Sequence, residues 1–330
     1  MRKHEFAGGE ASAAVLEREA RQNEALRVVN GIARATGTEL PVLAHEGGRF
    51  SDKPGIYLLD PDVIKNGPIK DASFNFDQRM LSGAADSAHA VIAGQLTVKH
   101  ESGLHVPATA VAAKCYQKRT FDERLARAER EVEVMRDMNN RGELALDPVA
   151  VAIAPDRQTG DTSVVLFTRF NDSLYTLDNN PWGRGPTPFN VQNAADAAGA
   201  LGRFNSMGWQ HRDAKIKNVA SVAGLGVGMI DFETTDPFDP NDPNAARDAA
   251  YADLDYFVSS LGDKDFLKRK QNRDFSDNSD QIVGAVQAVC DSYLGAWGDA
   301  SPDVQAQVLE VTMDVADNAT RRAFGEAVNV

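Results

Sequence analysis

The order of secondary-structure patterns between residues 76 and 170 constrains the fold of this chain more than any other feature. Two runs rich in β-branched residues, 89–100 and 105–116, are separated by E-S-G-L and predict a β-hairpin. Residues 121–138 carry apolar side chains at spacings of three and four, which indicates an amphipathic helix. Two more strand patterns follow at 147–155 and 162–170. We therefore expect a small antiparallel sheet with one helix.

The chain becomes helical after Pro181. Apolar residues recur at helical spacing in 190–207, 250–261, 282–294 and 302–316, and residues 227–232 have the pattern of a short buried strand. Residues 1–75 read as an N-terminal extension, with one helix at 11–35 and a loop-rich remainder. The sequence thus predicts an α+β chain in three parts: the extension 1–75, a small lobe 76–170, and a larger, mainly helical lobe 171–330.

Composition excludes several classes of protein. Hydrophobic residues make up 42% of the chain, and the net charge is −13. No apolar run approaches the ~20 residues of a membrane helix, and the N-terminus lacks the apolar core of a signal peptide. Nucleic acid binding relies on clustered cations, whereas this chain is acidic. Cys115 and Cys290 form neither a CxxC motif nor a disulfide framework. We expect a cytoplasmic protein that binds no nucleic acid and spans no membrane.

One loop carries an unusual density of charged and imidazole side chains. Residues 208–220 read G-W-Q-H-R-D-A-K-I-K-N-V-A, and M-I-D-F-E follows at 229–233. Asp213 stands directly after His-Arg, Asn218 follows five positions later, and Asp231 lies on the next strand pattern. Each of these residues alone would be an ordinary turn residue. Together, at these spacings, they resemble the catalytic loop and the metal-binding segment of the protein kinase superfamily.

This resemblance implies a two-lobed protein kinase-like fold, with ATP and Mg²⁺ in a cleft between the lobes. In the family, the loop aspartate orients the attacking hydroxyl and accepts its proton, a role that falls on Asp213. Lys215 would contact the transferred phosphoryl group. Asn218 and Asp231 would supply oxygen ligands to the magnesium.

The same resemblance points to nucleotide-binding residues upstream. V-A-A-K, ending at Lys114, is similar to the family's V-A-I-K, whose lysine pairs with a helix glutamate. Glu131 is the first candidate for that glutamate and Glu129 the second. About 200° of helix separates these two positions, so only one can face the lysine. Gly83, in L-S-G-A-A-D-S-A-H-A-V, is the best candidate for the glycine-rich loop.

The segment T-R-F at 168–170 resembles the hinge between kinase lobes, where backbone groups of Thr168 and Phe170 would meet adenine. Three features depart from the family pattern. No G-x-G-x-x-G precedes the lysine, Glu233 stands where the family has glycine, and no A-P-E follows Asp231. The short, turn-rich stretch after Asp231 is more similar to aminoglycoside and lipopolysaccharide kinases.

These features leave three functions open. We favour phosphoryl transfer to a protein Ser or Thr hydroxyl, because Lys215 is typical of protein kinases in the resembling family. A small-molecule kinase of aminoglycoside or sugar type is the alternative, favoured by the short segment. A pseudokinase that only binds is the third, favoured by the degraded glycine loop. In each case Asp253 or Asp255, from the following helix, could anchor the backbone of the catalytic loop.

Overall fold

The computed structural model describes residues 5–45, 47–82, 89–117, 119–156, 159–170, 174–176, 191–222, 226–261 and 279–323. The chain divides into two compact units. Unit 1 comprises Met1–Arg136 and Leu146–Asp172, and unit 2 comprises Asp137–Ala145 and Ser173–Val330. Among the described residues, no helix combines the length and the apolar character that crossing a membrane requires.

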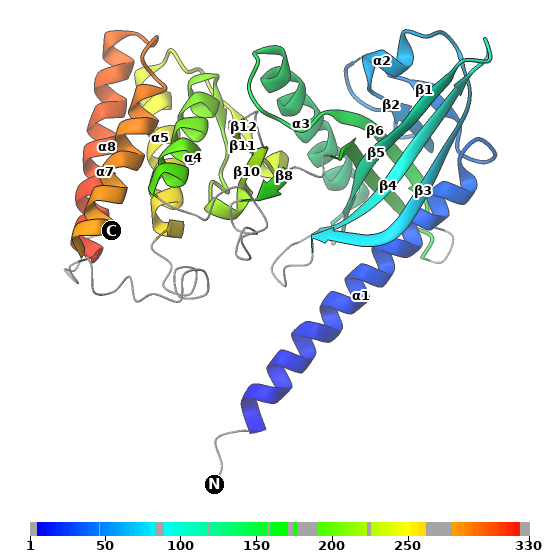
Figure 1. The fold of residues 1–330 in the computed structure, drawn as a ribbon, viewed down its shortest axis with the longest axis horizontal. Coiled ribbons are helices and arrows are strands. Elements are labelled where there is room, and N and C mark those ends of the chain that lie inside the picture. Colours follow the sequence, from blue (N-terminus) through cyan, green and yellow to red (C-terminus); the bar gives the residue numbers. More distant parts are fainter. Residues whose placement is uncertain are drawn as a thin grey trace. The chain divides into compact units, whose positions relative to one another are not determined.

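Unit 1 is built on one seven-stranded sheet, in the order β1-β2-β6-β7-β5-β4-β3 (Figure 1). The long β3–β4–β5 meander and the β6–β7 pair are antiparallel, whereas β1 and β2 run parallel. The strands are β1 (Val42–Ala44), β2 (Gly55–Leu58), β3 (Ile69–Ser82), β4 (Ala90–His100), β5 (His105–Tyr116), β6 (Pro148–Pro155) and β7 (Thr162–Arg169).

This sheet is larger and less uniform than the small antiparallel sheet expected from the sequence. Strand β2 pairs with β6, and β3 pairs with β4 from Ile69 onward. Residues 42–75 therefore contribute strands to the sheet and are not an appended extension. The apolar patches at 42–44 and 55–58 are only three and four residues long, too short for a periodic pattern. They become strands because of the partners they pair with in the folded chain.

Helices cover both faces of this sheet. Ala25, Val29 and Ile32, from α1 (Glu5–Ala35), pack in one core with the inward side chains of β2–β7. Residues Ala113 and Cys115 of β5 belong to that core. Because side chains alternate along a strand, Lys114 points to the other face, where α3 (Phe121–Asn140) lies. The short helix α2 (Pro61–Ile64) connects β2 to β3, and the N-terminal part of α1 extends beyond the sheet (Figure 1).

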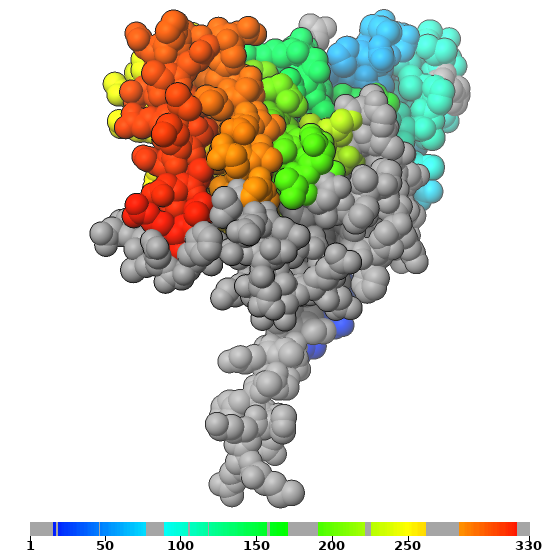
Figure 2. All heavy atoms as spheres, turned by 60° about the vertical axis from the view of Figure 1, so that its left-hand side comes forward, coloured from blue at the N-terminus to red at the C-terminus, as the bar shows by residue number. Residues whose placement is uncertain are grey.

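Unit 2 is mainly helical. Its long helices are α4 (Val191–Ser206), α5 (Pro243–Leu261), α7 (Ser279–Gly295) and α8 (Pro302–Ala323). Figure 2 shows α7 and α8 side by side on one face. Helices α4 and α7 approach closely because of Gly199 and Gly202, which lie three residues apart on one face of α4. A Cβ atom at Gly202 would lie 2.6 Å from the carbonyl oxygen of Tyr293.

A small antiparallel sheet in unit 2 sets the position of the charged loop. It contains β8 (Leu174–Thr176), β10 (Val219–Val222) and β11 (Gly226–Met229). Val219 pairs with Met229, and the amide of Ile230 donates to the carbonyl of Asn218 at 2.9 Å. The short 3-10 helices η2 (Ile216–Asn218) and η3 (Phe232–Thr234) and the two-residue strands β9 (Trp209–Gln210) and β12 (Asp236–Pro237) complete this region. The segments before β10 and after β11 therefore lie side by side.

Candidate functional site

The charged loop 211–218 is fixed to α5 by one buried carboxylate. Asp253 is 1% exposed and accepts hydrogen bonds from the backbone amides of His211 (2.7 Å) and Arg212 (2.8 Å). Asn205 Nδ2 donates to the same carboxylate at 2.8 Å. Arg212 has a left-handed backbone with φ of 62°, a conformation that costs about 1–2 kcal/mol outside glycine. The two bonds to Asp253 hold this bend. Asp253, one of the two candidate anchors, therefore binds the loop backbone.

The surroundings of Asp253 explain how a carboxylate can lie there. Burial raises the pKa of the Asp253 carboxyl above its ordinary value, and the hydrogen bonds that it accepts oppose that shift. Asn205 is itself fully buried, donates to the carbonyl of Trp209 at 2.8 Å, and accepts from the hydroxyl of Tyr293 at 2.6 Å. The carboxylate is thus one member of a hydrogen-bonded network that spans α4, α5 and α7.

His211 connects the loop to the segment that follows β11. Its Nδ1 accepts from the amide of Asp213 (3.3 Å), and its Nε2 faces the carbonyl of Ile230 (3.0 Å). These partners fit a ring that accepts at Nδ1 and donates from Nε2. The ring is completely buried and packs with Phe204 and Phe232, at centroid distances of 5.7 and 5.8 Å. His211 therefore braces two adjacent segments and is not exposed to a substrate.

The three loop residues singled out from the sequence lie together. Asn218 Nδ2 donates to Asp213 Oδ2 at 2.9 Å and to the Asp213 carbonyl at 2.8 Å. Lys215 Nζ lies 2.5 Å from the other carboxylate oxygen, Asp213 Oδ1. Partial burial lowers the pKa of Lys215, but its bond to Asp213 outweighs this effect and leaves the pKa above the usual value. Both oxygens of Asp213 are thus directed by neighbours within its own loop.

Tyr256 is a further neighbour of Asp213, which sequence reasoning missed. Its hydroxyl donates to Asp213 Oδ1 at 3.4 Å, and Lys215 Nζ lies 5.9 Å from the centre of its ring. The side chain is 43% exposed. No spacing rule links a tyrosine on α5 to a loop more than forty residues earlier.

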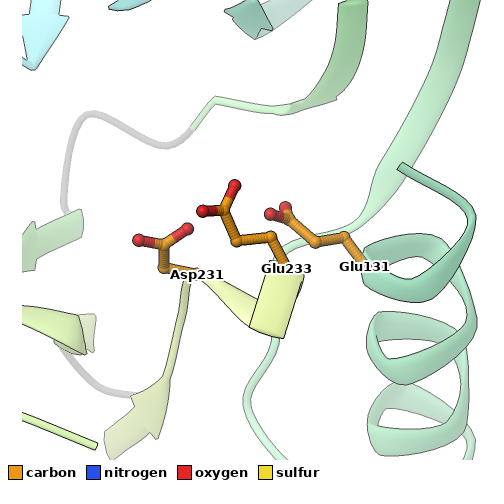
Figure 3. A group of neighbouring side chains, drawn as sticks. All are labelled: Glu131, Asp231 and Glu233. Atoms are coloured by element: carbon orange, nitrogen blue, oxygen red, sulfur yellow. The ribbon is translucent and has the colours of Figure 1, made fainter. Parts of the chain in front are cut away.

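Asp231 stands at the turn between β11 and η3. Its backbone is left-handed, with φ of 67° and ψ of 61°, and such strained residues concentrate at functional sites. The carboxylates of Asp231 and Glu233 project from this segment, and their oxygens lie within 4.8 Å (Figure 3). A cation held by two carboxylates this close would offset the repulsion between them. Glu233, noted in the sequence only as a replacement for glycine, is therefore a candidate metal ligand beside Asp231.

In unit 1, Lys114 and Glu131 form an ion pair between β5 and α3. The Glu131 side chain is 2% exposed and that of Lys114 is 15% exposed. Lys114 Nζ also lies 5.3 Å from the centre of the Tyr116 ring. Glu129, the second candidate, instead accepts from the amide of Phe50 at 2.8 Å. The helix phase thus selects Glu131 as the partner of Lys114.

The other residues predicted to bind the nucleotide are Gly83, Thr168 and Phe170. Gly83 lies outside the described residues. Thr168 is buried and pairs with strands on both sides. The amide of Phe170 donates to the carbonyl of Ala110 at 2.9 Å. The Phe170 amide, which we expected to meet adenine, is thus used within the sheet. Arg169 pairs through its side chain with Asp60 at 2.7 Å.

A cavity of about 410 Å³ lies in unit 1, on the face of the sheet opposite Lys114. Gly31 of α1 lines it, together with Ala154 and Ser163 from β6 and β7. The Arg27 guanidinium and the Asp156 carboxylate form an ion pair at its wall, and the hydrogen bond that Arg27 donates to Asp156 raises the pKa of Arg27. None of the residues that the sequence singled out lines this cavity.

Comparison with known proteins finds similarity to solved structures only, and it is distant in sequence. No family model and no curated protein matches this chain. Among solved structures, the chain is similar to one described as "WaaP in complex with acyl carrier protein". The two share 15% sequence identity with a TM-score of 0.35, over 66% of this chain and 88% of that chain.

Proposed function

We propose that this chain is an ATP- and Mg²⁺-dependent phosphotransferase with a two-lobed, kinase-like fold, which transfers a phosphoryl group to a hydroxyl. The observation that carries the proposal is the construction of the loop 211–218. Asp253 fixes the loop backbone, and Asn218 directs the carboxylate of Asp213. Phosphoryl transfer depends on positioning and on charge stabilisation more than on covalent help from the protein. A carboxylate fixed at both the backbone and the side chain meets that need.

The donor atoms of Asn218 and Asp231 fit a magnesium ion. Asn218 directs its two amide hydrogens at Asp213, so its amide oxygen faces the other way. Asp231 adds a carboxylate, and Glu233 supplies a second one within 4.8 Å. Mg²⁺ prefers hard oxygen ligands of this kind. Such an ion would supply positive charge to offset the negative charge of nucleotide phosphates. In unit 1, Glu131 holds Lys114, the cation that the kinase resemblance assigns to the nucleotide.

Asp213 acts on the acceptor in this proposal. Its Oδ1 orients the attacking hydroxyl and takes the proton as the new oxygen–phosphorus bond forms. Oδ2 stays bonded to Asn218, so the carboxylate keeps its direction through the reaction. Lys215 lies 2.5 Å from Oδ1 and gives way to the acceptor, moving to the transferred phosphoryl group. The same lysine thus directs the carboxylate before transfer and stabilises charge during transfer.

The acceptor that we propose first is a protein Ser or Thr hydroxyl, because a lysine two residues after the loop aspartate is typical of protein kinases. A small-molecule hydroxyl is the second candidate. One observation favours it: residues 232–242, between Asp231 and α5, form only η3, β12 and a turn. This stretch has no room for the long, switchable segment that positions protein substrates in many kinases.

The experiment is transfer of the γ-phosphate from labelled ATP by the full chain, with and without Mg²⁺. Acceptors are a generic protein mixture and a panel of aminoglycosides and sugars, and ADP release is measured in parallel. We expect Mg²⁺-dependent transfer that is lost in Asp213→Asn and in Asp231→Asn. The matched control is Asp248→Asn, an exposed position on α5 that pairs with its sequence neighbour Arg247.

Three outcomes separate the candidates. Label on proteins supports the first acceptor class, and label confined to a small molecule supports the second. Mg²⁺-dependent ATP binding without any transfer identifies a nucleotide-binding module that keeps the fold, the pseudokinase. If the chain neither binds ATP nor transfers phosphate, the proposed function is wrong.

A further inference from the structure

Helix α5 contacts the loop 211–218 at three successive points. Asp253 binds the amides of His211 and Arg212, Tyr256 donates to Asp213, and the hydroxyl of Ser260 accepts from the amide of Ile216 at 3.2 Å. The three α5 residues are spaced by three and four positions, so they share one face of the helix. Tyr256 is the middle contact. Its position relative to Asp213 is fixed by the contacts on either side.

The hydroxyl of Tyr256 occupies the position expected of an acceptor. It donates to Asp213 Oδ1, at 3.4 Å, and this is the oxygen to which the proposed reaction assigns the acceptor proton. A general base must lie within hydrogen-bonding reach of the proton that it removes, and this distance is often long before the substrates bind. Lys215, the proposed partner of the transferred phosphoryl group, lies 2.5 Å from the same oxygen. Tyr256 is also 43% exposed, unlike the buried Asp253.

We propose that Tyr256 is a site of self-phosphorylation within one molecule. This inference rests on the proposed function. The phenolic oxygen of Tyr256 forms a bond to the γ-phosphorus of ATP, and the bond from that phosphorus to the bridging oxygen breaks. ADP leaves with that oxygen. The phenolic proton passes to Asp213 Oδ1 and from there to solvent. The products are phosphotyrosine and ADP, and no further reactant is needed.

The modification limits transfer to other acceptors. A phosphoryl group carries a charge of about −1.5 to −2 near neutral pH. On Tyr256 it would lie beside the carboxylate of Asp213 and attract Lys215 away from it. Two negative groups then face the place that an external hydroxyl needs. Transfer to external acceptors should therefore decline as Tyr256 becomes phosphorylated.

A second tyrosine on the same helix provides an internal control. Tyr251 is 44% exposed, so it is as accessible as Tyr256. The two are five residues apart, which places them about 140° apart around the helix axis. Accessibility alone would label both residues equally. Transfer directed by Asp213, in contrast, would label Tyr256 and not Tyr251.

The test is peptide mapping by mass spectrometry after the full chain is incubated with ATP and Mg²⁺. We expect phosphate on Tyr256 and none on Tyr251. The phosphate on Tyr256 should be lost in Tyr256→Phe and Asp213→Asn but retained in Tyr251→Phe. Thermal unfolding verifies that each variant is folded. The rate constant should not depend on protein concentration, because donor and acceptor belong to one molecule. Inactive Asp213→Asn protein mixed with the wild type should stay unlabelled at Tyr256.

The other outcomes overturn the inference in distinguishable ways. Transfer to an external acceptor without phosphate on Tyr256 refutes the inference and leaves the proposed function intact. Equal labelling of Tyr251 and Tyr256 means that exposure, not Asp213, determines the site. A rate that rises with protein concentration means transfer between molecules. The absence of ATP binding and of ADP formation refutes the proposed function together with this inference.

Discussion

Replacing Asp253 by asparagine tests whether the buried carboxylate holds the loop. Asp253 Oδ2 accepts from His211 and Asn205, and Oδ1 accepts from Arg212, all within 2.8 Å. An asparagine has one oxygen, which can best replace Oδ2, and its amide then faces the Arg212 N–H. One charge-assisted bond is lost, two become neutral, and a donor is left without an acceptor. With each such loss at about 1–2 kcal/mol, the variant should lose roughly 3 kcal/mol of stability.

The measurement is urea unfolding at pH 7, followed by tryptophan fluorescence. All three tryptophans, at positions 182, 209 and 297, follow residue 172 in the sequence and so belong to unit 2. With a slope of ~2 kcal/mol per M, the midpoint should fall by about 1.5 M. Asp248→Asn, whose carboxylate is 72% exposed, should change stability by less than about 0.5 kcal/mol. A loss below about 1 kcal/mol in Asp253→Asn, with transfer activity unchanged, would refute the reasoning.

The pH dependence of this variant follows from the direction of the pKa shift. Burial raises the pKa of Asp253 above its ordinary value of 3.8, so the folded chain keeps this proton to a higher pH than the unfolded chain does. The stability that this group contributes is therefore complete below about pH 3.8 and falls as the pH rises through the folded pKa. Asp253→Asn has no such proton. Between pH 3.5 and 7, the free energy of unfolding of this variant should therefore decline less than that of the wild type.

Glu131→Gln breaks a buried ion pair, so it should cost about 3 kcal/mol of stability and abolish transfer activity. Glu129→Gln keeps an oxygen that can accept from the Phe50 amide and should cost less than about 1 kcal/mol. Equal losses of stability in the two variants would contradict the assignment of Glu131 as the partner of Lys114. Gly31→Ala should stabilise the chain by about 1 kcal/mol, because a Cβ atom there meets nothing within 4 Å and alanine is the better helix former; thermal unfolding checks this. Burial raises the pKa of the Cys115 and Cys290 thiols to about 12, so neither should react with iodoacetamide at pH 8 until the chain is unfolded in urea. As the pH rises from 9 toward 12, the unfolded thiols ionise before the folded ones, and stability should fall.

The sequence predicted helices and strands where buried and exposed positions alternate regularly along the chain. The hairpin of β4 and β5, the amphipathic α3 and the pair β6–β7 all lie where strand and helix periodicity predict them. The first strands were not predicted because β1 and β2 are only three and four residues long. They are defined by pairing, β1 with β2 and β2 with β6. Pairing between distant segments leaves no periodic trace in so short a run.

In the candidate site, spacing along the sequence could not decide which of two nearby carboxylates makes a given contact. Glu129 and Glu131 differ by two positions, as do Asp253 and Asp255, so each choice depends on the phase of a helix. That phase can be read from neighbouring apolar residues. Asp253 lies between the completely buried Ala250 and Phe257, three residues after one and four before the other.

A carboxylate within an apolar helical stripe is costly unless hydrogen bonds satisfy it. Its position there is therefore evidence that a partner exists, and Asp253, with its three donors, bears out that rule. Tyr256 lies at the exposed edge of the same stripe, where a side chain needs no partner and no such argument applies. Buried charged groups of a site can thus be inferred from helix phase, whereas its exposed groups become visible only when the fold brings loop and helix together.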